Sequence, residues 1–197
     1  MPVTHAYSAS GPGVIKIQQQ LNVASTTRLP RLNTDGAYGA LTMGRVMEFQ
    51  SQEKIGIDGA VGPETQRVLD AEKPVSAAPS GFCILVDLIN NRLRAFQHGG
   101  LALDFKPIHG GSATDPSTRG VFKVFRRERF HTSSKFPIPP GNMDFALFYH
   151  GAEALHQGPP TVPSHGCIHV EPSQAEKLFN WAKASRDIMV IVLKLKA

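Results

Sequence analysis

The stretch from Glu72 to Ser80 separates two parts of the chain that have different hydrophobic periods. Its two prolines stand among alanines and serines, a composition typical of a linker. Before it, apolar residues recur at the spacing of amphipathic helices, and after it they alternate with polar residues as in strands. The sequence therefore predicts a multidomain chain with α and β parts: a tail over 1–12, a small three-helix bundle over 13–71, a linker over 72–80 and a mainly-β sandwich or barrel over 81–197.

An internal repeat organises the helical part. The run Asp35-Gly36-Ala37-Tyr38-Gly39 recurs as Asp58-Gly59-Ala60-Val61-Gly62, and each copy is an Asp-Gly turn with a second glycine before a polar helix start. Pro63 suits the first position of a third helix, because its missing N–H would have no intrahelical partner there. Three short helices joined by two matched turns predict a compact bundle of about sixty residues, small but able to fold alone.

Residues Ser164-His165-Gly166-Cys167-Ile168-His169 have the composition of a nucleophile loop. A cysteine attacks as its thiolate, so it needs an imidazole to take the proton and backbone N–H groups to hold the oxyanion that forms. The hexapeptide supplies imidazoles on both sides of Cys167. Gly166 lets the chain turn without a Cβ clash and present the N–H groups of Gly166 and Cys167 to a reacting carbonyl oxygen. We therefore predict that Cys167 is a catalytic nucleophile.

Two other interpretations of this cysteine are open. A cysteine in apolar surroundings is most often an inert buried hydrophobe. Zinc is the second alternative, because His165, Cys167 and His169 would share one face of a strand and His156 could complete the ligand set. The chain has no Cys-x-x-Cys pair, which structural zinc sites usually show. The adjacent glycine and imidazoles favour the nucleophile, and we expect no metal.

The other cysteine is predicted to be structural. Cys83 lies in the apolar run Phe82-Cys83-Ile84-Leu85-Val86, where a thiol behaves as a small hydrophobe. A disulfide between the two cysteines would consume the only candidate nucleophile.

The net charge limits the kinds of partner that the chain is expected to bind. Lys and Arg number 21 against 16 Asp and Glu, a net charge of +5 that would favour an anionic polymer such as nucleic acid, a membrane surface or cell wall. The charges are scattered and no basic run is interleaved with aromatics, so we expect no nucleic-acid partner. No stretch is long and apolar enough to be an integral membrane segment.

The first thirteen residues lack the basic start, apolar core and cleavage pattern of a Sec signal peptide. The sequence as written therefore leads us to expect export by another route, such as delivery into a neighbouring cell as an antibacterial effector.

Leu155-His156 followed by Ser164-His165-Gly166-Cys167-Ile168 resembles the active-site signature of the L,D-transpeptidases, cysteine enzymes that cross-link or trim bacterial peptidoglycan. The resemblance covers about residues 81 to 195, and the supporting matches in family order are Val86-Asp87-Leu88, Asn91-Arg92-Leu93, His98-Gly99-Gly100 and Gly120-Val121-Phe122. The chain departs from the family at His169, where arginine or asparagine is usual, and at 117–119, where a Thr-Pro pair usually precedes the glycine.

The helical part resembles the peptidoglycan-binding modules of cell-wall hydrolases. This match covers about residues 13 to 71 and rests on Leu21, the two Asp-Gly turns and the pair Phe49-Gln50. Together the two resemblances imply peptidoglycan as partner and the periplasm or cell wall as the place of action.

The transpeptidase resemblance implies acyl transfer through a thioester, without a cofactor. Cys167 would attack the carbonyl of the third stem-peptide residue and expel the terminal D-alanine, and an amine or water would resolve the acyl-enzyme. The other implied roles are His156 as general base, the Gln157 carbonyl as its orienting acceptor, His165 and Gly166 at the oxyanion site, and Ser164 and His169 as substrate contacts.

Two rival functions stand beside this one. A cysteine peptidase would hydrolyse peptidoglycan, but papain-like enzymes place the catalytic histidine after the cysteine, and here the best candidate precedes it. An inactive cell-wall-binding protein is the second rival, which the intact Cys-His set disfavours.

Both His150 and His156 precede the nucleophile, and we predict that His156 is the base. Residues 143–149 have the pattern of a strand, His150-Gly151 of a tight hairpin turn, and 152–155 of a return strand that ends at His156. A base must come within about 3 Å of the sulfur or act through one water, and a residue in the turn is expected to lie too far away.

The C-terminal part predicts one helix and one strand. Ser173 as N-cap with Glu176 three residues later matches a capping box, and Ile188 to Leu195 is expected to close the sheet.

Overall fold

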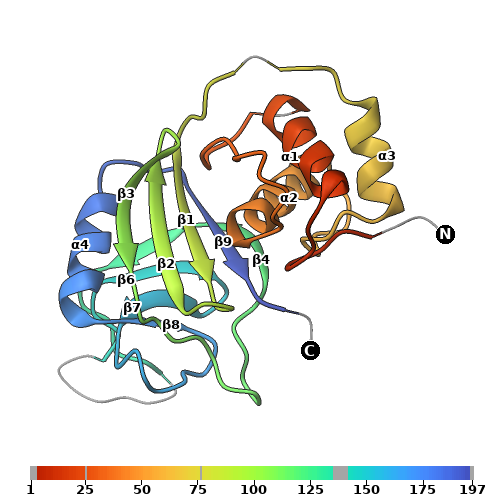
Figure 1. Ribbon diagram of the computed structural model, residues 1–197. Coiled ribbons are helices and arrows are strands. Elements are labelled where there is room, and N and C mark those ends of the chain that lie inside the picture. The colour runs from red at the N-terminus through yellow and green to blue at the C-terminus, as the bar shows by residue number, and fades with distance from the viewer. Residues whose placement is uncertain (1–3, 25, 76, 135–141, 196–197) are drawn as a thin grey trace. The chain divides into compact units, whose positions relative to one another are not determined.

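The structure is a computed structural model that describes residues 4–24, 26–75, 77–134 and 142–195 (Figure 1). Its contacts divide the chain into two compact units, one formed by the residues up to Cys83 with Phe96–Gly100 and one by Ile84–Ala95 with the residues from Leu101 onward. The predicted order of a three-helix part followed by a mainly-β part is confirmed. No helix in the described part of the chain has the length and apolarity needed to cross a membrane.

Three helices make up the N-terminal part: α1 (Pro12–Ala24), α2 (Ala40–Gln52) and α3 (Pro63–Ala71). Pro63 occupies the start of α3, as predicted. The apolar stripes of α1 and α2 form the core, and their fully buried side chains are Val14, Ile17, Leu21, Val46, Met47 and Phe49. The repeat in the sequence is thus a repeat of turn and helix in the structure.

Two buried glutamines hold the turns of this repeat. The Gln50 amide donates to Asp58 Oδ1 (2.8 Å) and to the Ala60 carbonyl (2.9 Å), and its oxygen accepts from the Gly59 N–H (2.9 Å). Gln18 makes the same three kinds of bond with the turn of the first copy. Gly59 has φ +68, and a Cβ there would lie 2.9 Å from Met43 side-chain atoms, so this turn requires glycine.

We expect Gln50→Ala to destabilise the helical part by about 2–4 kcal/mol, because buried backbone N–H groups of the turn lose their acceptor. The matched control is Gln52→Ala on the same helix, an exposed side chain with one bond to the Thr26 carbonyl, which should cost below about 1 kcal/mol. Urea unfolding followed by helical circular dichroism measures both. Equal losses in the two variants would contradict the role assigned to Gln50.

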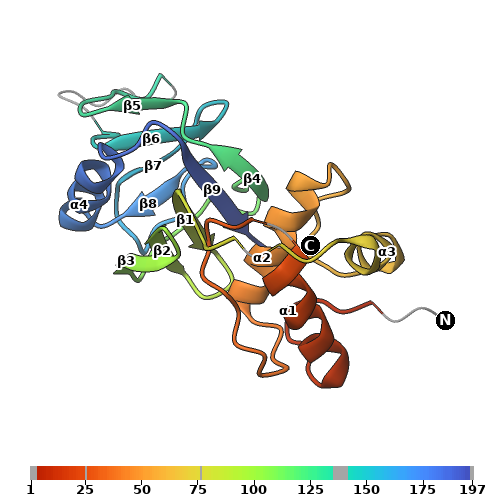
Figure 2. The same cartoon turned by 90° about the horizontal axis from the view of Figure 1, so that it is seen from above.

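The β part contains two sheets. The five-stranded sheet has the order β3-β2-β1-β9-β4, and its strands are β1 (Phe82–Asp87), β2 (Arg92–Gln97), β3 (Gly100–Phe105), β4 (Gly120–Lys123) and β9 (Ile188–Leu193). The four-stranded sheet has the order β5-β6-β7-β8, visible as successive strands in Figure 2, and its strands are β5 (Arg126–Glu128), β6 (Ala146–His150), β7 (Glu153–Gln157) and β8 (Ile168–Val170). In the four-stranded sheet β7 and β8 run parallel, and the other neighbours are antiparallel.

One helix, α4 (Pro172–Ala182), packs against β6 and β7 of the four-stranded sheet. The predicted helix is present, and Ala175, Leu178, Phe179 and Ala182 form its buried stripe, but the predicted capping box is wrong. The N-cap is Glu171, whose carboxylate accepts from the N–H groups of Ser173 and Gln174. Pro172 explains the difference, because proline fits the first helical position and moves the cap two residues upstream of Ser173.

Candidate active site

The parallel pair β7–β8 places the predicted nucleophile and base on one face of a sheet. Leu155 pairs with Ile168, and His156 pairs with His169. Side chains alternate along strands and paired residues share a face, so His156, His169 and Cys167 point to the same side. The Cα atoms of His156 and Cys167 are one strand and two residues apart, about 8 Å, which an imidazole and a thiol side chain can span.

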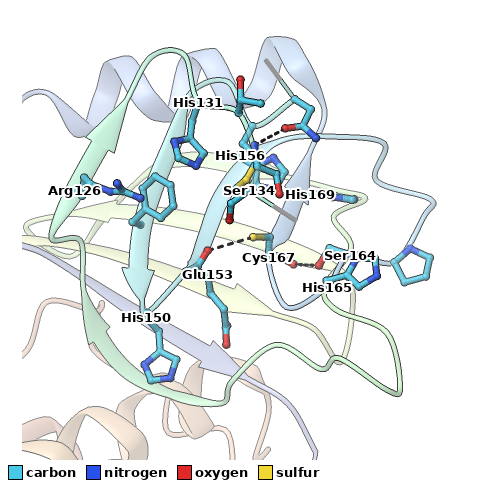
Figure 3. Close-up of a pocket in the computed structure, with 18 residues that line it drawn as sticks. Arg126, His131, Ser134, His150, Glu153, His156, Ser164, His165, Cys167 and His169 are labelled. Atoms are coloured by element: carbon cyan, nitrogen blue, oxygen red, sulfur yellow. Dashed lines mark hydrogen bonds between the residues drawn. The ribbon is translucent and has the colours of Figure 1, made fainter. Parts of the chain in front are cut away.

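These side chains line one cavity of about 810 Å³ (Figure 3). The sequence-predicted residues among its lining are Cys167, His156, His165, His169 and Ser164. Gly166 and Gln157 are not part of the lining, and their predicted contributions are through the backbone. The structure thus brings the predicted side chains together around one concave surface.

His156 is a neutral imidazole with a defined tautomer. Burial lowers its pKa to about 4, since the side chain is only 5% exposed. Nδ1 lies 2.6 Å from the backbone carbonyl oxygen of Gln157, which can only accept, so Nδ1 carries the proton and donates it. The lone pair is therefore on Nε2. The ring of His169 packs edge-on against His156, with centroids 5.1 Å apart.

Cys167 is half-buried and directly precedes strand β8. Its side chain packs against an apolar cluster that includes Phe148 and Ala154. Sγ lies 3.8 Å from the carbonyl oxygen of Ala152, within reach of a weak hydrogen bond donated by the thiol. The nucleophile therefore has apolar packing on one side and a backbone acceptor on the other.

The expectation that the hairpin turn lies far from the sulfur is wrong. The turn consists of Gly151 and Ala152, not of His150 and Gly151 as predicted, and the Ala152 carbonyl lies against Cys167. His150 ends strand β6 and also lines the cavity. The reason is the register of the parallel pair, which sets Cys167 level with Ala154 near the start of β7. His150 is exposed, and its ring packs on Phe122 with centroids 4.8 Å apart.

The nucleophile loop is fixed by hydrogen bonds from an adjacent segment. The Ser164 hydroxyl, 5% exposed, donates to the carbonyl of Cys167 (2.5 Å), which favours support of the loop over the predicted substrate contact. Backbone bonds join Ser164 N–H to Gly110 and Ser112 N–H to Ser164. Gly166 has φ +102, a conformation that favours glycine.

A glycine in the neighbouring segment is needed for this approach. A Cβ on Gly111 would lie 2.8 Å from the Gly166 nitrogen and 2.0 Å from the Asp115 carbonyl oxygen. The Gly111 N–H donates to the Ser117 hydroxyl at 2.8 Å. Sequence reasoning did not identify this contact, and the pair Gly110-Gly111 is the signal that could have done so.

Glu153 also lines the cavity and was missed in the sequence. Its carboxylate accepts from the N–H (3.0 Å) and hydroxyl (2.5 Å) of Thr118 and from the hydroxyl of Tyr149 (2.9 Å). Burial, with the nearby carboxylate, raises the pKa of Tyr149, so this phenol stays protonated and donates. A Cβ on Gly166 would lie 3.3 Å from the Glu153 side chain, which shows how closely the two pack.

The two cysteines differ in accessibility. Both are free thiols. Cys83 is completely buried, and burial raises its pKa well above the ordinary value, so it is not available as a thiolate. Across the described residues, no three His, Cys, Asp or Glu side chains converge in a way that could hold a metal ion.

Comparison with known families accounts for both parts of the chain. Residues 82–192 match the model of the L,D-transpeptidase catalytic domain. The chain belongs to the L,D-transpeptidase family. Residues 10–69 match a putative peptidoglycan-binding domain. The family is one of cysteine transferases, so the chain is an enzyme of that class.

Solved structures share the fold. An L,D-transpeptidase from Stackebrandtia nassauensis is 21% identical with a TM-score of 0.53, and the match covers 100% of this chain and 98% of that one. An L,D-transpeptidase from Mycobacterium smegmatis is 22% identical with a TM-score of 0.50 over 57% of this chain and 58% of that one. Among curated proteins, a probable N-acetylmuramoyl-L-alanine amidase from Bacillus licheniformis is 37% identical over 78 residues. That match covers 40% of this chain and 22% of the amidase.

The low pKa of His156 gives a direct test of its environment. The free imidazole titrates near 6.5, and burial in the folded enzyme should move the midpoint to about 4. Nuclear magnetic resonance of the His156 ring protons between pH 3 and 8, assigned with His156→Gln, measures it. The unfolded chain protonates this histidine at a higher pH than the folded chain does. The free energy of unfolding should therefore also fall as the pH decreases from about 6.5 to 4. A midpoint near 6.5 would contradict the buried neutral state.

Proposed function

We propose that this enzyme transfers acyl groups between peptidoglycan stem peptides through a thioester on Cys167. The observation that carries the proposal is the parallel pairing of β7 and β8, which sets a neutral, oriented His156 on the same face and in the same cavity as Cys167. A nucleophile within reach of a base that is itself held by a third group is the arrangement typical of covalent acyl transfer.

The steps follow from these atoms. His156 Nε2 takes the thiol proton as Sγ bonds to the carbonyl carbon of the third stem-peptide residue. The tetrahedral intermediate collapses when the bond to the terminal D-alanine nitrogen breaks, and His156 returns the proton to that amine. An amine of a second stem, or water, then attacks the thioester and gives a proton to His156, the bond to Sγ breaks, and Sγ takes that proton from His156 to become the thiol again. Attack by an amine gives a cross-link, and attack by water gives a trimmed tripeptide.

The oxyanion site is proposed at the backbone N–H groups of Gly166 and Cys167, beside His165. Gly166 is buried, and within the described ranges its N–H has no acceptor. A buried donor without a partner costs free energy, and a developing oxyanion would satisfy it. The positive φ of Gly166 supports this assignment, because it sets the direction of the peptide units on either side.

The helical part is proposed to bind peptidoglycan and to keep the enzyme at its polymeric substrate. The match to a putative peptidoglycan-binding domain over residues 10–69 supports this role. Action on peptidoglycan implies the periplasm or cell wall. The route by which the enzyme arrives there stays a prediction.

The direct test of the proposed function is incubation of the full-length protein with a stem tetrapeptide that ends in D-alanine. We expect release of D-alanine with formation of tripeptide or cross-linked dimer, measured by mass spectrometry of the products. Cys167→Ala should abolish the release while keeping the fold, and Cys83→Ala should keep the activity with a modest loss of stability from the small cavity. Undiminished D-alanine release by Cys167→Ala would rule out the cysteine mechanism.

A second prediction distinguishes the two histidines of the hairpin. His156→Ala should slow acylation of Cys167 by a carbapenem about a hundredfold or more, the usual contribution of a general base. His150→Ala should stay near wild type, because this exposed ring packs on Phe122 and, within the described ranges, no acceptor orients it as the Gln157 carbonyl orients His156. The carbapenem adduct is followed by intact-protein mass over time. A greater loss in His150→Ala would reverse the assignment.

A further inference from the structure

A single row of paired residues crosses the four-stranded sheet and ends at the nucleophile. Arg126 on β5 pairs with Phe148 on β6, and Phe148 pairs with Ala154 on β7. The register of β7 and β8 sets Ala154 level with Cys167. Paired residues share a face of the sheet, so the guanidinium and the thiol belong to the same side. Figure 3 shows Arg126 and Cys167 around the same pocket, on its two sides.

The Arg126 side chain is exposed and lies over this face of the sheet. Its Cζ lies 3.8 Å from the centroid of the Phe148 ring, and Nη1 lies 3.1 Å from Glu128 Oε1. The second oxygen of Glu128 lies 2.5 Å from Nδ1 of His131, whose ring packs edge-on against Phe148. The cation is therefore oriented by an aromatic face and a shared carboxylate.

This cation has donors left for a ligand. Arginine carries five N–H groups in a planar fork that matches a carboxylate. Among the described residues, the polar partner of Arg126 is Glu128, through Nη1, which leaves Nε and Nη2. Arg126 is also the only lysine or arginine among the described residues that line the cavity.

The separation fits a substrate that ends just beyond the bond to be broken. The guanidinium over Phe148 lies about two strand spacings, about 10 Å, from the backbone of Cys167. The cysteine side chain, the bond to the attacked carbonyl carbon and a hydrogen bond to arginine take up most of that distance. With the three bonds from the scissile carbonyl carbon to the carboxylate carbon of one further residue added, the extended path is slightly longer than this distance, so a bent path spans it.

We propose that Arg126 binds the C-terminal carboxylate of the donor stem peptide and thereby selects donors that end one residue past the scissile bond. The inference rests on the proposed function and deepens it, because it assigns the leaving-group side of the site to the β5 edge of the cavity. A donor whose terminal carboxylate is amidated, or displaced by an additional residue, loses this ion pair.

The test compares a D-alanine-terminated tetrapeptide with its C-terminal carboxamide, as kcat/KM for release of the terminal residue. Wild type should prefer the acid by about 10- to 100-fold, the usual worth of a charge-assisted hydrogen bond. Arg126→Gln should remove the preference by slowing the acid alone, and Arg126→Lys should restore part of it. The matched control is Arg127→Gln, because Arg127 neighbours it on β5 but points to the opposite face, and it should keep the wild-type preference.

Other outcomes would overturn the proposal. If Arg126→Gln lowers kcat/KM equally for the acid and the amide, or lowers neither, the assignment of Arg126 to the carboxylate is contradicted. A further comparison uses donor peptides with and without a carboxylate on the side chain of the third residue. If the loss in Arg126→Gln depends on that side-chain carboxylate, Arg126 binds it and not the C-terminal carboxylate.

Failure of the proposed function is distinguishable from failure of this inference. If neither peptide acylates wild type, the transpeptidase proposal fails. The inference can still be tested by calorimetric titration of the tetrapeptide acid and amide into Cys167→Ala with and without Arg126→Gln. An acid preference that requires Arg126 supports the carboxylate site, and equal affinities contradict it.

Discussion

The active site depends on the parallel pairing of two short strands, β7 and β8. This pairing fixes which residues of the two strands stand side by side, with His156 opposite His169 and Cys167 level with Ala154. A shift by one residue would turn either the imidazole or the thiol to the other face of the sheet, because side chains alternate with a period of two. The hydrogen bonds that fix the nucleophile loop to the segment around Gly110 therefore also protect the register.

Burial then gives His156 the chemistry that the reaction needs. An imidazole in water near neutral pH is partly protonated, whereas burial in this cavity lowers the pKa of His156 to about 4 and keeps Nε2 free of a proton. The Gln157 carbonyl fixes the tautomer without placing a charged group beside the imidazole. The same sheet row carries Phe148 and Arg126, so one set of strand pairings positions base, nucleophile and the proposed carboxylate site.

Local features of the fold were predictable from the sequence, and long-range features were not. The Asp-Gly repeat predicts the two turns of the helical part because its residues are adjacent in the chain, although the buried bonds of Gln18 and Gln50 to those turns require the folded bundle. The hairpin around Gly151 was also predictable. Its distance from Cys167 was not, because it depends on how β7 pairs with a three-residue strand, β8, that carries too little pattern to reveal its partner.

Other errors have the same origin. Glu153 was missed because its partners Thr118 and Tyr149 come from different strands and loops, so no spacing in the chain indicates them. The helix cap was misplaced by two residues because a glutamate can cap when proline follows it. The candidate nucleophile was recognisable because its glycine and imidazole neighbours are adjacent in the chain.

In the proposed reaction Cys167 forms the acyl bond with the stem peptide. The most direct measurement is to quench the full-length protein during turnover of a stem tetrapeptide, digest it at low pH and locate the added mass by tandem mass spectrometry. We expect a tripeptide acyl group, free of the terminal D-alanine, on the fragment that contains Cys167. An acyl group on Cys83, or turnover without any covalent intermediate under conditions that trap thioesters, would contradict it.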